Sequence, residues 1–270
     1  MAEAGRNLAP PSRWLLLAEG RALGELLTSS LAMPLLRRGP RGDGHPVMVL
    51  PGFLASGLST RFMRSFLKQV GYNPHCWRMG RNLGPAPGLE NRLLDRLRGL
   101  RRRYQRKVSL VGWSLGGVYS RLLANLDPEP VRSVITLGSP FNDNPKANQA
   151  WRLFEWVSST EIEGLDPAMM DNVRRTPPVP TTAIYTEGDG VTAWQCCVDS
   201  GGPLSENIRV PGSHCGLGFN PLVLHAIADR LAQGEGEWRP FERSGVKSVL
   251  YPGVRKAEAA LAEGEGEEQT

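Results

Sequence analysis

Short apolar runs alternate along this chain with longer stretches of helical periodicity. The apolar runs begin near residues 46, 75, 107, 131, 181 and 207. Their length, and the glycines and prolines around them, are typical of strands buried in a sheet. Stretches with apolar residues every three or four positions predict helices near residues 59, 89, 115 and 220. The alternation predicts an α/β fold with a mostly parallel central sheet flanked by helices.

The N-terminal segment over residues 13–36 is rich in leucine and resembles a membrane span in composition. Glu19, Arg21 and Glu25 interrupt it early, so no apolar run reaches the roughly 20 residues that a span requires. We therefore predict an amphipathic helix. It either packs on the domain or rests on a membrane surface or a partner, and the sequence leaves these alternatives open.

The chain divides into three predicted parts. Residues 1–45 hold the N-terminal helix and its connector, residues 46–240 one α/β domain, and residues 241–270 a C-terminal extension. The alanine- and glutamate-rich end of that extension is expected to lie outside the core. A length of 270 residues with 40% hydrophobic content is enough for one substantial core.

Residues 141–178 form a connection that is too long for a simple crossover between strands. We predict a small helical cap here, which either roofs a pocket or packs permanently on the core. If it roofs a pocket, its side chains favour an apolar ligand. The apolar residues concerned are Trp151, Leu153, Phe154, Trp156, Val157, Ile162, Leu165, Met169 and Met170.

The most informative motif is the run over residues 112–116, Gly-Trp-Ser-Leu-Gly. It follows the predicted strand over residues 107–111 and precedes the helix-like residues 118–126. A serine on such a tight turn needs nearly side-chain-free neighbours, because its backbone is strained. The turn predicts an exposed Ser114 hydroxyl, with the N–H of Leu115 aimed at a reacting carbonyl group.

Residues for nucleophilic catalysis follow other predicted strands in a consistent order. Upstream, the loop over residues 51–54 offers the N–H of Phe53 as a second oxyanion donor. Downstream, Asp189 lies between two glycines after the strand near residue 181, and His214 lies in a glycine-containing loop after the strand near residue 207. The order along the chain is therefore Ser, Asp, His.

This order resembles that of the α/β-hydrolase family, over roughly residues 46–233. The runs over residues 137–141 and 178–180 are similar to those of bacterial lipases and esterases. Many members of the family carry His-Gly in the first oxyanion loop, whereas this chain has Pro51-Gly52. The donor is the N–H that follows, so the change leaves the predicted oxyanion hole intact.

Other residues are also considered for the roles of acid and base. Glu187 and Asp199 are the other candidates for the acid beside Asp189. His45 and His75 are expected before strands and His225 within a helix, so His214 is the predicted base. Trp113 and Leu54, next to the serine and in the oxyanion loop, are predicted to contact the substrate.

Charge and cysteine content indicate which partners and which kinds of site are expected. The net charge is +5, with many arginines over residues 92–106, but leucines at helical spacing among them indicate a solvated helix face. No interleaved aromatic residues accompany these arginines, so nucleic acid is not an expected partner. The four cysteines have no C-x-x-C spacing and are expected to be reduced, which predicts no metal site and no disulfide framework. The expected location is the cytoplasm, with membrane association through the N-terminal helix left open.

The predicted function is hydrolysis of carboxylic esters, as in lipases and esterases, with Ser114 as nucleophile, His214 as base and Asp189 as the acid that orients it. This chemistry needs no organic cofactor. One alternative is acyl transfer or thioester cleavage by the same three residues. Another is a noncatalytic binding protein with a hydrolase fold.

Overall fold

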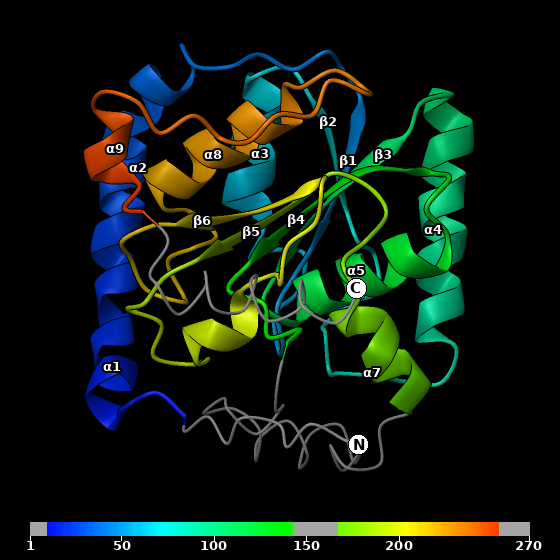
Figure 1. Ribbon diagram of the computed structural model, residues 1–270, viewed down its shortest axis with the longest axis horizontal. Helices are drawn as coiled ribbons and strands as arrows, with labels where there is room; N and C mark the ends of the chain where they lie inside the picture. The colour runs from blue at the N-terminus through cyan, green and yellow to red at the C-terminus, as the bar shows by residue number, and fades with distance from the viewer. Residues whose placement is uncertain (1–9, 143–166, 254–270) are drawn as a thin grey trace, which may run out of the picture.

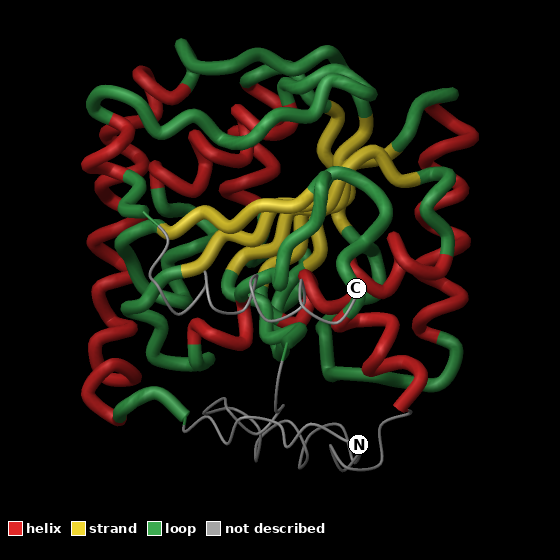
Figure 2. The backbone as a smooth tube through the Cα atoms, in the orientation of Figure 1, coloured by secondary structure: helices red, strands yellow, loops and turns green. Residues whose placement is uncertain are grey.

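The computed structural model describes residues 10–142 and 167–253, and a parallel sheet forms its centre (Figures 1 and 2). Each predicted strand region holds a strand, and the order across the sheet is β2-β1-β3-β4-β5-β6. All neighbouring strands run parallel, so their carboxyl ends share one edge. The strands are β1 Pro46–Leu50, β2 Asn73–Cys76, β3 Val108–Trp113, β4 Val131–Leu137, β5 Thr181–Tyr185 and β6 Ser205–Arg209.

Helices cover both faces of this sheet (Figure 1), which confirms the predicted fold class. They are α3 Arg61–Gln69, α4 Leu89–Tyr104, α5 Leu115–Leu126, α7 Pro167–Arg174, α8 Pro221–Leu231 and α9 Lys247–Leu250, with a 3₁₀ turn, η3, at Trp194–Cys197. The predicted N-terminal helix is present as α1 Arg13–Leu17, a 3₁₀ turn, η1, at Ala18–Arg21, and α2 Ala22–Leu36.

Alternation along β1 divides the core into two layers. Val47 and Val49 pack with α3 and α8, whereas Met48 and Leu50 pack with α4 and α5. This is the period of two that a strand buried on both faces requires. In α4 the leucines at helical spacing are buried in the second layer, as predicted. Arg92, Arg98, Arg102 and Arg103 are exposed, whereas Arg96 is half-buried and donates to the Cys76 carbonyl.

The position of β3 determines where a site can form. The chain goes from β1 to β2 on one side and then returns to place β3 on the other side of β1. Crevices in open α/β sheets form beyond the carboxyl ends of strands at such a reversal. The loop after β1 and the turn after β3 are therefore neighbours at the carboxyl edge.

The N-terminal segment packs on the domain. Leu36 is buried in the core layer of α8, with Ala32 and Met33 packed against it. The face of α2 that points away from the domain exposes leucines at a spacing of four residues, namely Leu23, Leu27, Leu31 and Leu35. In the described part of the chain, no helix has the length and apolar character needed to cross a bilayer. Contact with a membrane surface stays a prediction.

Part of the predicted cap is held on the core. Within α7, the backbone carbonyls of Val173 and Arg174 accept hydrogen bonds from the buried Arg121 guanidinium of α5, at 2.8 and 2.9 Å. Val173 is itself buried against α5. Of the predicted cap residues, Met169 and Met170 lie in α7, and the apolar positions from Trp151 to Leu165 lie outside the described residues.

The C-terminal extension begins inside the core. Phe241 and Tyr251 are both buried and their rings pack edge to face, 4.7 Å between centroids. The predicted acidic tail lies outside the described residues.

Candidate active site

The turn between β3 and α5 gives Ser114 an unusual backbone, with φ 54° and ψ −124°. A residue with a side chain adopts positive φ only at a cost in free energy, so neighbouring contacts must hold it there. A Cβ on Gly112 would collide with the Gly116 carbonyl, and one on Gly116 would collide with the Leu50 carbonyl. The two glycines are therefore required by the close packing of this turn, as the motif predicts.

The loop after β1 lies directly against the serine. A Cβ on Gly52 would be 3.2 Å from Ser114 Cβ. A turn follows, in which the Ala55 N–H donates to the Gly52 carbonyl at 3.2 Å. Phe53 lies in this turn, and Leu54, also in the turn, has a φ of 59°. Leu115 begins α5, where an N–H has no acceptor within the helix. The two predicted oxyanion donors thus lie on segments that flank Ser114.

Asn82 also holds the loop after β1, a role that its sequence context did not predict. This buried side chain donates from Nδ2 to the Pro51 carbonyl at 2.9 Å. Its backbone carbonyl accepts from Leu54 at 2.7 Å, and its N–H donates to Ala55 at 2.8 Å. The loop after β1 is therefore held on both sides. Nothing in the local pattern around residue 82 indicates this role, because the partners are about 30 residues away.

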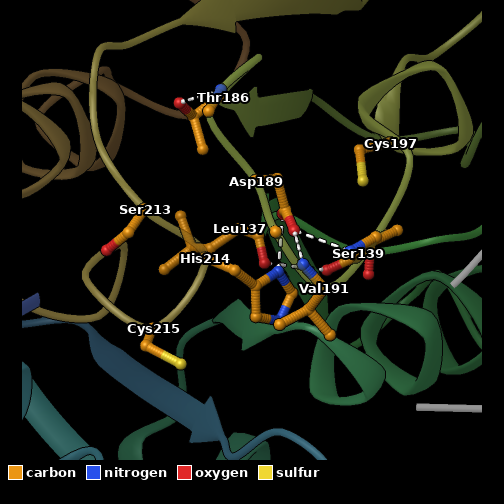
Figure 3. A network of polar contacts seen from close by, with 12 residues as sticks. Leu137, Ser139, Thr186, Asp189, Val191, Cys197, Ser213, His214 and Cys215 are labelled. Atoms are coloured by element: carbon orange, nitrogen blue, oxygen red, sulfur yellow. Dashed lines mark hydrogen bonds and ion pairs between the residues drawn. The ribbon is translucent and has the colours of Figure 1, made fainter. Parts of the chain in front are cut away.

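Asp189 and His214 meet at the carboxyl edge, although 25 residues separate them (Figure 3). Asp189 Oδ2 lies 2.6 Å from His214 Nδ1, and both side chains are almost fully buried. Asp189 Oδ1 accepts the N–H groups of Val191 at 2.8 Å and Thr192 at 2.7 Å. Backbone donors and the imidazole together satisfy both oxygens of the carboxylate.

The Asp189 contact also decides the protonation of the imidazole. A carboxylate only accepts hydrogen bonds, so Nδ1 carries the proton and the neutral ring presents a lone pair at Nε2. Burial lowers the pKa of His214, but the charges of Asp189 and Glu19 and the hydrogen bond to Asp189 outweigh it and raise that pKa above its ordinary value. The site can thus accept a proton at Nε2.

The other candidate acids have different partners. Glu187 pairs with Arg209 at 2.7 Å. Asp199 is fully buried in an ion pair with Arg121, and Thr176 Oγ1 donates to its Oδ1 at 2.7 Å. Asp189 is the acid that the structure brings to His214.

The other histidines lie away from this pair. His45 Nε2 contacts Ser109 Oγ at 2.9 Å, at the opposite edge of the sheet. His75 lies within β2, not before a strand as expected, because that strand begins earlier, at Asn73; it contacts the Tyr104 hydroxyl at 3.0 Å. His225 lies in α8, as predicted.

Trp113 connects the nucleophile turn to the histidine loop. Its indole N–H donates to the His214 carbonyl at 3.1 Å. Its ring packs edge to face with Phe219, 6.3 Å between centroids. The residue before Ser114 is thus bonded to the residue that carries the imidazole. Substrate contact by Trp113 and by the half-buried Leu54 stays a prediction.

Three charged residues of the N-terminal segment also reach the site, which their pattern in the sequence did not predict. Glu19, Arg21 and Glu25 hydrogen-bond to the loops that carry Asp189 and His214. Three charged residues within an otherwise apolar segment are visible in the sequence, but this pattern indicated only that the segment does not span a membrane.

None of the four cysteines, all of which lie in the described part of the chain, forms a disulfide. Across residues 10–142 and 167–253, no three His, Cys, Asp or Glu side chains gather as they would around a metal ion.

Comparisons with known proteins agree with this architecture. A family model described as the alpha/beta hydrolase fold matches residues 92–197. A sequence comparison with curated proteins finds no significant match.

Solved structures resemble the chain in fold. Lipase B of Aspergillus fumigatus has a TM-score of 0.59 at 16% identity, with 82% of this chain and 61% of the lipase covered. The lipase BlEst2 of Bacillus licheniformis has a TM-score of 0.54 at 16% identity, covering 71% and 94%. The monoacylglycerol lipase of Paleococcus ferrophilus has a TM-score of 0.52 at 12% identity, covering 71% and 96%. At these identities the likeness is one of fold.

Proposed function

We propose, on the premise that this chain has the α/β-hydrolase fold, that it is a serine hydrolase that cleaves carboxylic esters. The observation that carries the proposal is the Asp189–His214 pair, 2.6 Å apart, at the sheet edge where Ser114 is held at positive φ. Strained backbone and a buried carboxylate–imidazole pair both cost free energy to maintain. Their presence at one edge of the sheet is typical of acyl-transfer sites.

The chemistry proceeds in two steps. His214 Nε2 accepts the proton of Ser114 as Oγ attacks the ester carbonyl, and the alcohol leaves with that proton. Water then attacks the acyl-enzyme and gives its proton to His214, which returns that proton to Ser114 Oγ as the acyl–oxygen bond breaks and the acid product leaves. Asp189 keeps Nδ1 protonated and stabilises the imidazolium that forms in each step.

The N–H groups of Phe53 and Leu115 stabilise the oxyanion of each tetrahedral intermediate. The loop after β1 is adjacent to Ser114, and Asn82 holds its shape through three hydrogen bonds. Donors held in place before reaction pay no reorganisation cost as charge develops, and one such donor is worth about 3 kcal/mol.

The test combines a covalent probe with substrate profiling. A fluorophosphonate reacts with an activated serine, so the native chain is expected to be labelled and Ser114→Ala is not. With p-nitrophenyl esters of graded chain length, Ser114→Ala is expected to lose about 10⁴-fold or more in kcat with the fold retained. Ser65→Ala is the matched control, because Ser65 lies on α3, where its hydroxyl accepts a hydrogen bond from Gln69 at 3.1 Å. Undiminished turnover or labelling in Ser114→Ala overturns the proposal.

A further inference from the structure

The Glu19 carboxylate joins two loops that lie far from it in the sequence. Its Oε1 accepts the N–H of Gly190 at 2.8 Å and that of His214 at 3.0 Å. Its Oε2 accepts the N–H of Cys215 at 2.7 Å. Gly190 follows Asp189 directly, and His214 is the predicted base. One side chain, 8% exposed, therefore bonds to the backbone of both the acid loop and the base loop.

Arg21, two residues later, also bridges the acid loop and the base loop, but through a positively charged side chain. Its guanidinium donates to the Gly188 carbonyl in the acid loop and to the Gly212 carbonyl in the base loop, the latter at 2.8 Å. Glu25, one turn further, binds the base loop alone, through the Ser213 N–H at 2.9 Å and the Ser213 hydroxyl at 2.6 Å. Glu19 and Arg21 thus bridge the two loops, whereas Glu25 anchors one.

The glycines of the two loops make room for this segment. A Cβ on Gly190 would collide with the Leu15 carbonyl, and one on Gly216 would collide with Glu25. A Cβ on Gly188 would lie 2.6 Å from the Arg21 guanidinium. Gly190 admits no larger residue because the Leu15 backbone approaches it so closely. At Gly188 and Gly216 the side chains of Arg21 and Glu25 occupy the space that a Cβ would take.

Apolar contacts also attach the helix to the domain, through Leu36, Ala32 and Met33 near the end of α2. Leucines are abundant in the segment, and several of them remain exposed on its outer face. Yet all the charged side chains between Trp14 and Leu36, namely Glu19, Arg21 and Glu25, bond to the two loops. Burying a carboxylate costs free energy unless its hydrogen bonds are made, so its use here in place of an apolar contact indicates a role in fixing the loops.

We propose that Glu19 is a positioning residue, which ties the Asp189 loop to the His214 loop and so fixes the geometry of the carboxylate–imidazole pair. The inference rests on the proposed function for its catalytic consequence. Glu19 touches no reacting atom; it acts through the backbone of residues 190, 214 and 215. A displacement of about 1 Å in such a pair can cost 100-fold in rate.

Several charged groups surround the imidazole. Asp189 faces it directly, and Glu19, Arg21 and Glu25 approach its loop from the N-terminal segment. The neighbouring Cys215 thiol stays neutral, because burial and Glu19 raise its pKa to about 12. The negative charge of Glu19 is one of the causes that raise the pKa of His214. Removing that charge is therefore expected to lower the pKa of His214.

The test is Glu19→Gln in the full chain. We expect kcat for a p-nitrophenyl ester to fall about tenfold or more, with KM changed less than threefold. The acid limb of the pH profile, where kcat/KM falls as His214 becomes protonated, is expected to move to lower pH, because the imidazole of the variant stays neutral at lower pH than that of the native chain. A loss of folded enzyme alone would lower the apparent kcat at unchanged KM but would leave the acid limb in place, so the shift of the limb separates a positioning role from destabilisation. Glu129→Gln is the matched control, since it removes one exposed carboxylate far from both loops.

Two measurements are independent of catalysis. Amide hydrogen exchange is expected to accelerate at Gly190, His214 and Cys215 in Glu19→Gln, and the NMR titration of His214 is expected to shift to lower pH. If the native chain hydrolyses no ester, the proposed function fails while these measurements still decide the role of Glu19. Unchanged exchange at the three amides, or an unchanged kcat and pH limb in an active enzyme, overturns the inference.

Discussion

Asp189 and Asp199 are buried aspartates ten residues apart, and each binds a different basic side chain. Asp189 holds His214 and two backbone N–H groups, whereas Asp199 holds Arg121, which in turn binds three backbone carbonyls of residues 173–175. The first arrangement fixes an imidazole tautomer at the sheet edge. The second joins α5, α7 and the segment after η3. The same type of side chain orients an imidazole in one place, where we propose that it serves catalysis, and joins packed elements in the other.

Substitution by asparagine separates these two roles. Asp189→Asn offers His214 an amide that no longer enforces the Nδ1–H tautomer, so kcat is expected to fall about 10⁴-fold with little change in the free energy of unfolding. Asp199→Asn leaves the buried Arg121 without its counter-charge, and is expected to lower the free energy of unfolding by about 3 kcal/mol. Ester turnover and urea unfolding of both variants check this. If Asp199→Asn loses more turnover than Asp189→Asn, the catalytic acid is Asp199 and not Asp189.

Among the elements, the strand–turn–helix unit around Ser114 is the most constrained. Its glycines are tightly enclosed, because β1, β3 and α5 approach one another at the backbone. The helix before it, α4, is different: a Cβ on Gly99 would meet no atom within 4 Å. Glycine is therefore a requirement of tertiary packing in the turn and carries only an entropic cost in α4.

Alanine at the two glycines is expected to have opposite effects. In Gly116→Ala the new methyl group collides with the backbone of residues 50 and 51, so we expect a loss of about 2 kcal/mol or more in stability, and a loss of activity. In Gly99→Ala the helix gains about 0.5–1 kcal/mol with activity unchanged. Thermal unfolding and ester turnover of each variant are the measurements. A neutral Gly116→Ala would contradict the close packing described for the turn.

At the scale of the whole molecule, titratable groups at the two edges of the sheet respond to pH in opposite ways. His214, at the carboxyl edge, has a raised pKa, so its contribution to stability is full below the unfolded pKa and is lost as pH rises through the folded value. His45, at the other edge, is fully buried between Asp43 and Ser109. Burial is the main cause that lowers its pKa from 6.5 to about 4.

Acid is therefore expected to destabilise the fold through His45. Between pH 6.5 and about 4 the unfolded chain binds a proton at this residue and the folded chain does not, so stability falls as pH falls. The shift corresponds to at most about 3 kcal/mol. Urea unfolding at pH 7, 5.5 and 4.5 measures this loss, and His45→Gln is expected to show a smaller one. An equal loss in both chains would assign the acid sensitivity to other groups.

The sequence determined the elements and the serine turn, because these depend on local patterns. Apolar runs, helical spacing and a glycine on each side of Ser114 report backbone requirements that neighbouring residues satisfy among themselves. Chain order also placed Asp189 and His214 after strands, and hence at one edge of a parallel sheet.

Only the tertiary structure decided which acid meets the imidazole, and which other residues hold the site. The sequence favoured Asp189 but left Asp199 open as an alternative, and the packing of α5 and α7 assigns Arg121 to Asp199. The contacts of Asn82 with the loop after β1, and of Glu19 with residues 190, 214 and 215, join segments about 30 to nearly 200 residues apart. No local periodicity reports such contacts, because they depend on how the chain packs in three dimensions.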